Sequence, residues 1–289
     1  MSANALNTTF GIVSPAGGLE TNDFDSALAA LKSRGFAAKV FPHAREKYGY
    51  LSAPAEERAA DLAAAWSDPE IDAVLCTRGG FGSAHLLPML DWERMKPRKL
   101  PLLGYSDITA LHFAMDSIGV GRPIAAPMLK SLSELDGGSF QALLDVLERR
   151  WHETCGIETL TGETGFSGRP LAGNLTVMTS LLGTPYFPDP VGRVLFIEEV
   201  GEALYRIDRM LTQLEQAGVF RRCSGVVLGA FTEGDFTAAE LREVLYRVLK
   251  NSGRPAVIGY PFGHEPPFHA IDFSAHVAAE NGKIVQLFE

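Results

Sequence analysis

The sequence has little cysteine and no long apolar run. It contains three cysteines in 289 residues, and Cys76, Cys155 and Cys223 lie too far apart for a metal site or a disulfide framework. Separated cysteines are typical of reduced thiols, so we expect a cytoplasmic protein. Cys76 could be a nucleophile, but its place at the end of an apolar run favours a small buried strand residue.

Basic charge is also scarce and scattered. The chain has 26 Lys and Arg against 35 Asp and Glu, a net charge of -9, whereas nucleic-acid binders usually present clustered Lys and Arg. We therefore expect no nucleic-acid partner. The absence of an apolar run of about 18 residues excludes a transmembrane helix, so we expect no membrane partner either.

Two further signals are missing. The start of the chain, "MSANALNTTFGIVSPAGG", lacks the basic region and apolar core of a signal peptide. The seven histidines form no HxxxH or HxH pair on an expected helix or strand, which indicates no metal site. Nothing in the sequence predicts a cofactor.

What is present is an alternation of apolar strands and amphipathic helices over residues 1–130. This order predicts a parallel, doubly wound, flavodoxin-like sheet, in which ligands bind beyond the carboxyl ends of the strands. The segment "RGGFG" and Ser106 both follow such strands and should share one crevice. We expect strands at 8–15, 37–41, 71–77 and 100–105, and helices at 22–35, 55–66, 83–90 and from 106 onward.

The pattern weakens over residues 131–170 and then resumes. We expect an N-terminal α/β domain over 1–150, a linker over 151–170 and a smaller C-terminal α/β domain over 171–289, with the active site in the cleft between the domains. In the second domain, helices are expected at 174–183, 202–218 and 237–250, and strands at 192–200, 223–231, 254–264 and 283–289.

Ser106, in "GYSDIT", allows two interpretations. Serine is a common N-cap, and on local grounds capping is the simpler one. A nucleophilic serine needs a base and a group that orients the base. His264 is the natural base, because it follows a buried strand in a Gly/Pro-rich loop; His85, His112 and His269 are the alternatives.

An acidic partner for that base is found in "LFIEEVGE". Glu198 and Glu199 close an otherwise apolar strand, where a buried carboxylate needs a partner. Without other information, the pair could simply mark the point where the strand leaves the core.

Several motifs, in this order and spacing, resemble the LD-carboxypeptidases, also called muramoyltetrapeptide carboxypeptidases. The resemblance covers almost the whole chain. The motifs are "IVSPAG", "RGGFGSAHLLPMLDW", "GYSDITALH", "AGNLTVMTSLLGTP", "LFIEEVGEALYRIDRMLTQL", "GVVLGAF" and "GYPFGHE".

The resemblance implies a Ser-His-Glu triad made of Ser106, His264 and Glu198. It also implies an oxyanion hole of backbone N–H groups from Asp107 and the glycine pair of "RGGFG", for which we name Gly80. Glycines let a backbone N–H approach an oxygen closely. Because the resemblance implies that Ser106 is the nucleophile, we favour that role for Ser106 over helix capping.

The resemblance further implies a cytoplasmic serine peptidase that releases terminal D-Ala from murein tetrapeptides in peptidoglycan recycling. Arg78, Gly79 and Asn174 of the shared motifs are expected to contact the murein peptide, and the family suggests a homodimer. After His264 the chain reads "EPPFHAIDFSAH" where many members have a "TLPLG"-like segment, so His269 and Asp272 are unusual.

Two other functions remain open from the sequence. One is an amidase or peptidase acting on aminoacyl- or peptide-nucleotide conjugates, as in antibiotic self-immunity. The chain lacks the long insertion between the serine and glutamate regions of such relatives, which favours peptidoglycan recycling. The other is a non-catalytic phosphate or nucleotide binder using "RGGFG", although no GxxxxGK[ST] or GxGxxG opens a helix here.

Overall fold

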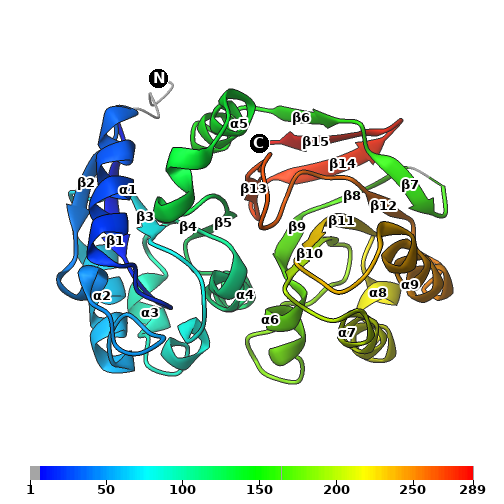
Figure 1. The fold of residues 1–289 in the computed structure, drawn as a ribbon, viewed down its shortest axis with the longest axis horizontal. Coiled ribbons are helices and arrows are strands. Elements are labelled where there is room, and N and C mark those ends of the chain that lie inside the picture. The colour runs from blue at the N-terminus through cyan, green and yellow to red at the C-terminus, as the bar shows by residue number, and fades with distance from the viewer. Residues whose placement is uncertain (1–6, 164, 289) are drawn as a thin grey trace.

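The chain folds into two halves that lie side by side, each built around its own sheets (Figure 1). The computed structural model describes residues 7–163 and 165–288. The first residues of the expected N-terminal domain and the last residue of the final expected strand lie outside this range. No helix within it is both long and apolar enough to cross a membrane.

The N-terminal half is a doubly wound sheet, as expected. In the described residues its strand order is β13-β5-β4-β3-β1-β2. β1 to β5 are parallel, and their order is that of a flavodoxin-like sheet. The strands are β1 (Thr9–Val13), β2 (Ala37–Val40), β3 (Ala73–Cys76), β4 (Pro101–Gly104), β5 (Arg122–Ala125) and β13 (Ile271–Asp272).

Helices cover both faces of this sheet. In β1, Ile12 packs into the core formed with α1 and α5, whereas Val13 packs into the core formed with α2 and α4, because alternate strand residues point to opposite faces. The helices are α1 (Thr21–Ser33), α2 (Ala55–Ser67), α3 (Trp92–Met95), α4 (Thr109–Ile118) and α5 (Gly137–Leu147), with 3₁₀ helices η2 (Pro42–Arg45), η3 (Ser83–Leu86), η4 (Ser106–Ile108) and η5 (Leu129–Glu134).

One expected helix of this half is shorter than predicted. The pattern over 83–90 predicted a full helix, but only the 3₁₀ helix η3 forms there. Pro88 has no N–H to continue a helical hydrogen-bond ladder, which limits the segment to a short turn.

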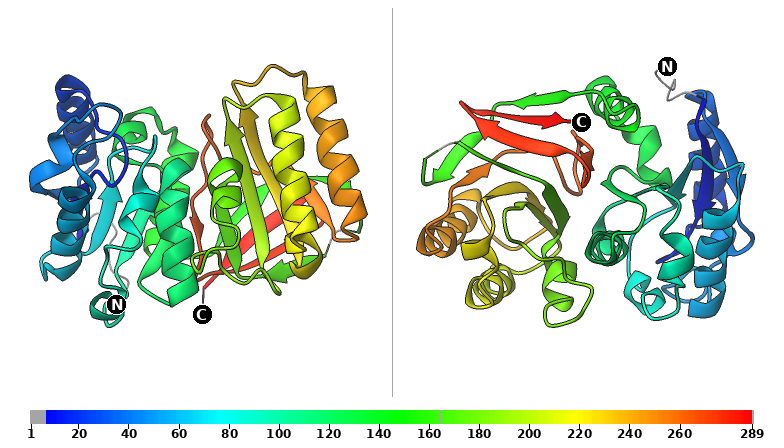
Figure 2. Two further views of the ribbon diagram at one scale, coloured as in Figure 1. Left: turned by 90° about the horizontal axis from the view of Figure 1, so that it is seen from below. Right: turned by 180° about the vertical axis from the view of Figure 1, so that it is seen from behind.

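The C-terminal half contains two sheets (Figure 2). Within the described residues, one has the order β7-β12-β11-β10-β9 and the other β6-β15-β14-β8. β9 to β12 are parallel. The elements are β6 (His152–Cys155), β7 (Glu158–Thr161), β8 (Phe166–Gly168), β9 (Pro170–Asn174), β10 (Val194–Val200), β11 (Gly225–Thr232), β12 (Ala256–Ile258), β14 (His276–Glu280), β15 (Lys283–Leu287), α6 (Leu175–Ser180), α7 (Leu204–Gln216), α8 (Val219–Arg222) and α9 (Ala238–Asn251).

The expected connection over 131–170 is more ordered than predicted. It contains η5 and α5, and the part expected as a linker, 151–170, contains β6, β7 and β8. These strands pair with β15, β12 and β14, which lie about a hundred residues further along the chain. Short strands whose partners are this distant leave little local pattern, so the segment belongs to the C-terminal sheets rather than to a free linker.

The chain returns from the C-terminal half to complete the N-terminal sheet. After β12 it forms a loop and then adds β13 antiparallel to β5. Arg122 Nε on β5 lies 2.6 Å from Asp272 Oδ2 on β13, and Asp272 is fully buried. The unusual residue Asp272 therefore holds the two halves together.

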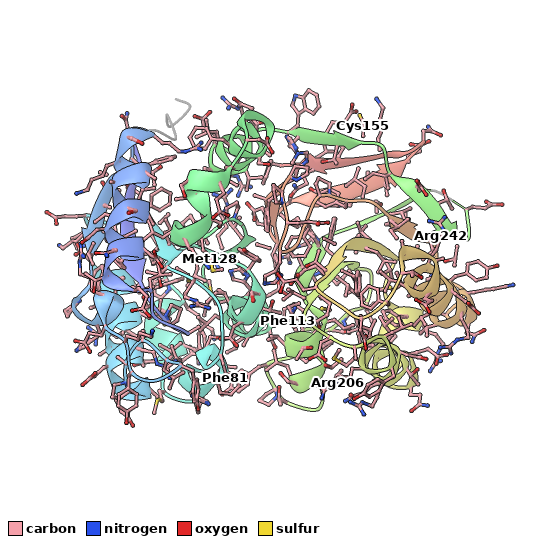
Figure 3. The ribbon with its side chains drawn as sticks, viewed as in Figure 1. Phe81, Phe113, Met128, Cys155, Arg206 and Arg242 are labelled. Atoms are coloured by element: carbon pink, nitrogen blue, oxygen red, sulfur yellow. The ribbon has the colours of Figure 1, made fainter. Side chains whose placement is uncertain are left out.

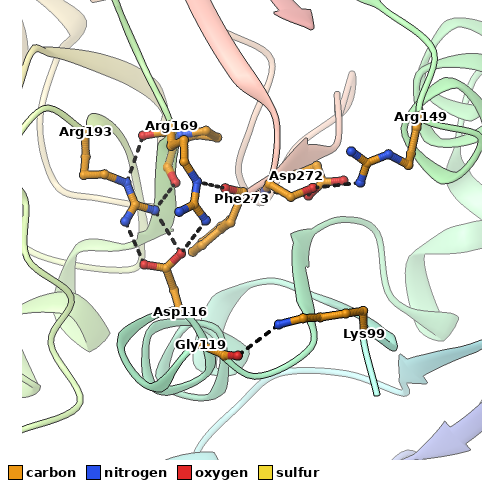
Figure 4. Close-up of polar contacts among 10 residues, drawn as sticks. Lys99, Asp116, Gly119, Arg149, Arg169, Arg193, Asp272 and Phe273 are labelled. Atoms are coloured by element: carbon orange, nitrogen blue, oxygen red, sulfur yellow. Dashed lines mark hydrogen bonds and ion pairs between the residues drawn. The ribbon is translucent and has the colours of Figure 1, made fainter. Parts of the chain in front are cut away.

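A second ion-pair cluster joins the halves (Figure 4). Asp116 on α4 accepts hydrogen bonds from Arg193 at 2.8 and 3.0 Å and from Arg169 at 3.3 Å. Both arginines belong to the C-terminal half. The contacts at Asp116 and Asp272 fix the position of one half against the other.

We expect Asp272→Ala to lower the free energy of unfolding by about 3–5 kcal/mol, because it leaves the largely buried Arg122 without its carboxylate. Asp189→Ala is the matched control: it removes an exposed ion pair with Arg222 and should cost no more than about 1 kcal/mol. Urea unfolding monitored by circular dichroism measures both. Equal losses in the two variants would contradict a structural role for Asp272.

Candidate active site

Ser106 sits on a strained turn between β4 and α4. Its φ is +62°, a left-handed value that is uncommon for any residue with a side chain and that is often found at functional sites. The N-cap residues of η4 and α4 are Tyr105 and Ile108, and neither makes a side-chain cap. Ser106 is therefore not an N-cap.

The Ser106 hydroxyl instead contacts His264. Oγ lies 3.1 Å from His264 Nε2, and the other ring nitrogen, Nδ1, lies 2.7 Å from Glu198 Oε2. The distance from the hydroxyl to the ring lies within the range of about 2.6–3.2 Å expected for a serine and its general base, and the ring contacts Glu198 rather than Glu199. The structure thus brings together three side chains from β4–η4, β10 and the loop after β12.

Aromatic packing and backbone contacts fix the His264 loop. The ring of Tyr105 lies 5.0 Å from both the His264 and the Phe268 rings, centroid to centroid. Phe262 O accepts a hydrogen bond from Ala230 N at 2.8 Å, and Phe268 N donates to Ser139 Oγ at 2.9 Å. Burial raises the pKa of Tyr105 to about 12, so its ring stays neutral beside the imidazole.

The adjacent carboxylates Glu198 and Glu199 have different surroundings. The register of β10 against β11 shifts between Ile197 and Glu199. Glu198 is fully buried and faces His264; its Oε1 has no hydrogen-bond partner in the described part of the chain. Glu199 accepts from Val200 N at 2.9 Å and from Thr176 N and Oγ1 at 2.8 and 2.7 Å. Burial raises the pKa of Glu199, against the effect of these hydrogen bonds.

Asn174 differs from the expectation that it contacts substrate. It is 4% exposed, donates from Nδ2 to Glu199 at 2.9 Å and caps α6 by accepting from Val177 N. Both ends of its amide are used inside the protein. Asn174 therefore links the start of α6 to the carboxyl end of β10, and this structural role accounts for its place in the motif.

The glycine pair after β3 lies against the serine. A Cβ placed on Gly79 would lie 2.9 Å from Ser106 Oγ and 3.4 Å from Asp107 N, and Gly80 has a φ of +116°. The Asp107 carboxylate accepts from Ser83 N at 2.8 Å, which ties the end of "RGGFG" to the turn of Ser106. Only glycine fits at 79, and the backbone there can face an atom bound to Ser106.

A cavity of about 430 Å³ opens over these groups. Arg78 and Gly79 line it, whereas Asn174 is not among its lining residues. Met128, labelled in Figure 3, contributes an apolar wall. Three further charged residues of this cavity, Lys130, Glu134 and Glu233, lie outside the sequence motifs quoted above.

The alternative bases lie elsewhere. His112 is buried, contacts Leu102 O at 3.0 Å and has a pKa lowered by burial to about 3. His269 contacts His152 and Thr154 at 3.3 and 2.8 Å, and burial lowers its pKa to about 4. His85 lies 3.5 Å from Arg58. Of these histidines, none contacts Ser106.

In the described residues, neither the cysteine thiols nor the potential metal ligands form a second candidate catalytic site. Cys76 is buried in β3, as expected, and burial raises its pKa. Cys223 is also buried, whereas Cys155 is exposed on β6 at the edge of the molecule (Figure 3). Residues 7–163 and 165–288 contain no group of three or more His, Cys, Asp or Glu that could hold a metal ion.

Two α/β halves and a hydrogen-bonded Ser-His-Glu set are typical of hydrolases that activate a serine. Residues 10–121 match the LD-carboxypeptidase N-terminal domain, and residues 167–278 match the LD-carboxypeptidase C-terminal domain. The chain belongs to the LD-carboxypeptidase family.

Relatives of known name support this assignment. The probable murein peptide carboxypeptidase of Bacillus subtilis (strain 168) is 32% identical, over 99% of this chain and 93% of that protein. The murein tetrapeptide carboxypeptidase of Pseudomonas aeruginosa is also 32% identical, over 89% of this chain and 86% of that protein. These relatives span nearly the same length as this chain.

Solved structures agree on the fold. The muramoyltetrapeptide carboxypeptidase from Oxalobacter formigenes superposes with a TM-score of 0.88 at 26% identity, covering 96% of this chain and 98% of that one. MccF in complex with glutamyl sulfamoyl guanosine also gives 0.88, at 22% identity and 98% and 97% coverage. At 22% identity, the similarity to MccF shows a shared fold and nothing more.

We expect Gly79→Ala to lower kcat/KM for peptide hydrolysis by about 100-fold, since a methyl group there displaces the serine and small displacements of reacting groups are costly. Gly137→Ala is the control, because a Cβ at 137 has no neighbour within 4 Å. Steady-state kinetics with a peptide substrate and thermal melting measure both variants. A Gly79→Ala enzyme that melts normally and retains full activity would contradict the close fit.

Proposed function

We propose that this protein is a serine-type LD-carboxypeptidase that hydrolyses the L,D amide bond before the terminal D-Ala of murein tetrapeptides. The observation that carries the proposal is the chain of contacts from Ser106 through His264 to Glu198 at the floor of the 430 Å³ cavity. A serine hydroxyl attacks an amide only when a base removes its proton.

In the first half of the proposed reaction, Ser106 Oγ attacks the carbonyl carbon while neutral His264 takes the hydroxyl proton on Nε2. Glu198 accepts a hydrogen bond from His264 Nδ1–H, which orients the ring and stabilises its protonated form. The C–N bond then breaks, and Nε2 passes its proton to the leaving amine. The products are an acyl-serine and the released amino acid.

In the second half, a water molecule gives its proton to His264 Nε2 and its oxygen attacks the acyl-serine. The serine oxygen recovers the proton as it leaves. Each attack places negative charge on the carbonyl oxygen, and the N–H groups of Gly80 and Asp107 are the donors we propose for that charge. The proximity of Gly79 to Oγ and Asp107 N supports this assignment.

The substrate assignment is supported by the names of the relatives, a murein peptide and a murein tetrapeptide carboxypeptidase. An amidase of aminoacyl- or peptide-nucleotide conjugates would use the same three side chains. Mass spectrometry of the protein incubated with a murein tetrapeptide, or with an aminoacyl sulfamoyl adenosine, separates the two activities. Loss of one alanine from the tetrapeptide supports the proposal. Peptidoglycan recycling, a cytoplasmic location and a homodimer stay predictions.

We expect Ser106→Ala and His264→Ala each to lower kcat by at least about 10⁴-fold, and the double variant to lose no more than either one, because the groups act as a unit. Glu198→Gln should cost less, since Glu198 acts through His264 and does not touch the reacting atoms. Single-turnover kinetics on the murein tetrapeptide measure all four variants.

Ser180→Ala and His276→Ala are the controls, since both residues are exposed and lie outside the cavity. Each should retain wild-type activity. Activity of Ser106→Ala within tenfold of wild type would exclude Ser106 as the nucleophile, and with it the proposed mechanism.

A further inference from the structure

Two cationic side chains line the cavity without a carboxylate partner. Arg78 and Lys130 both face the space above Ser106. Among the described residues, no Asp or Glu oxygen lies within 4.0 Å of either side chain, although many other arginines and lysines of the chain are paired. Unpaired cations in the cavity of a protein with net charge -9 indicate a place for a bound anion.

The backbone holds these two cations next to each other. Lys130 N donates to Thr77 O at 3.0 Å, and Thr77 immediately precedes Arg78 in the chain. The Arg78 guanidinium lies over the loop after β1, with Nη1 3.5 Å from Gly18 O. Both side chains therefore start from neighbouring backbone positions at the carboxyl end of β3.

The position of η5 identifies the part of the substrate that lies near Lys130. A leaving amine must come within reach of His264 Nε2 to receive a proton. Ser131 and Glu134 of η5 line a smaller cavity together with His264 and Tyr105, so η5 flanks the imidazole. Lys130 stands in the first turn of this helix and lines the larger cavity together with His264.

We propose that Arg78 and Lys130 bind the free carboxylate of the residue that is released, and that this contact makes the enzyme act at chain ends only. The inference rests on the proposed function. A terminal carboxylate would accept charge-assisted hydrogen bonds from both cations. A C-terminal amide or a longer chain would displace water from them and provide no negative charge in exchange, which is unfavourable.

The carboxylates in the same cavity, Glu134 and Glu233, make the arrangement more selective. The charges of Arg78, Lys130, Glu134 and Glu233 sum to zero, so the attraction for an anion comes from the two cations locally and not from the net charge of the cavity. Binding requires a negative group at the position of Arg78 and Lys130 specifically. Glu233 has a φ of +55° and comes from the C-terminal half, so it faces the cavity from the other side.

The test compares a murein tetrapeptide with the same peptide carrying a C-terminal amide. We expect the wild-type enzyme to cleave the free acid at least about 100-fold faster, in kcat/KM, than the amide, the size expected of charge-assisted hydrogen bonds. Lys130→Met should lower kcat/KM for the acid by at least about tenfold and leave the amide within twofold. Lys130→Arg should restore most of the preference.

Lys32→Met is the matched control, since Lys32 is an exposed lysine of α1 and should change neither rate. Equal cleavage of acid and amide by the wild type, or an equal loss on both peptides in Lys130→Met, would overturn the inference.

A binding measurement separates this inference from the proposed function. Isothermal titration of Ser106→Ala with the two peptides should show tighter binding of the acid, and Ser106→Ala combined with Lys130→Met should abolish the difference. If the wild type cleaves neither peptide but this difference is present, the proposed reaction fails and the carboxylate site stands. If the acid and the amide bind equally, the carboxylate site fails.

Discussion

The hydrogen bond between Ser106 and His264 crosses from one half of the protein to the other, so the site exists only while the halves keep their relative position. The serine belongs to the N-terminal sheet, and Glu198 belongs to β10 of the C-terminal sheet. His264 lies in a loop whose two ends are anchored in different sheets, at β12 and at β13. The ion pairs of Asp272 with Arg122 and of Asp116 with Arg193 hold this geometry.

Local strain and close packing then set the position of the hydroxyl. The left-handed φ of Ser106 turns its side chain toward His264, and the glycine at 79 leaves room for it. Strain of this kind costs about 1–3 kcal/mol and persists only where the surroundings enforce it. Here the Asp107–Ser83 hydrogen bond and the buried start of α4 enforce it.

Much of this site could be predicted from the sequence. Ser106, Glu198 and His264 each end a strongly apolar strand or follow one, and each sits in a motif that resembles one family. The doubly wound order of β1 to β5 was also predictable, because apolar strands alternate with amphipathic helices and the runs of β1, β3 and β4 are buried on both faces. In these cases local pattern and tertiary structure agree.

The other parts of the fold and of the site depend on contacts between segments that are distant in the sequence. β6, β7, β8 and β13 are short and pair with strands far away in sequence, so no local pattern indicates them. Asn174 sits in a family motif, yet only its contact with Glu199 reveals that it supports the fold. Lys130 and Glu233 carry no motif at all, and only the folded chain brings them to one cavity.

The measurement that tests the account most directly is covalent labelling of the nucleophile. A fluorophosphonate reacts with a serine whose hydroxyl is activated by a base, and peptide mapping by mass spectrometry locates the adduct. The account predicts one adduct, on Ser106, formed at least about 100-fold more slowly in His264→Ala, as expected when the general base is lost. An adduct on another residue, or an equal labelling rate in His264→Ala, would contradict it.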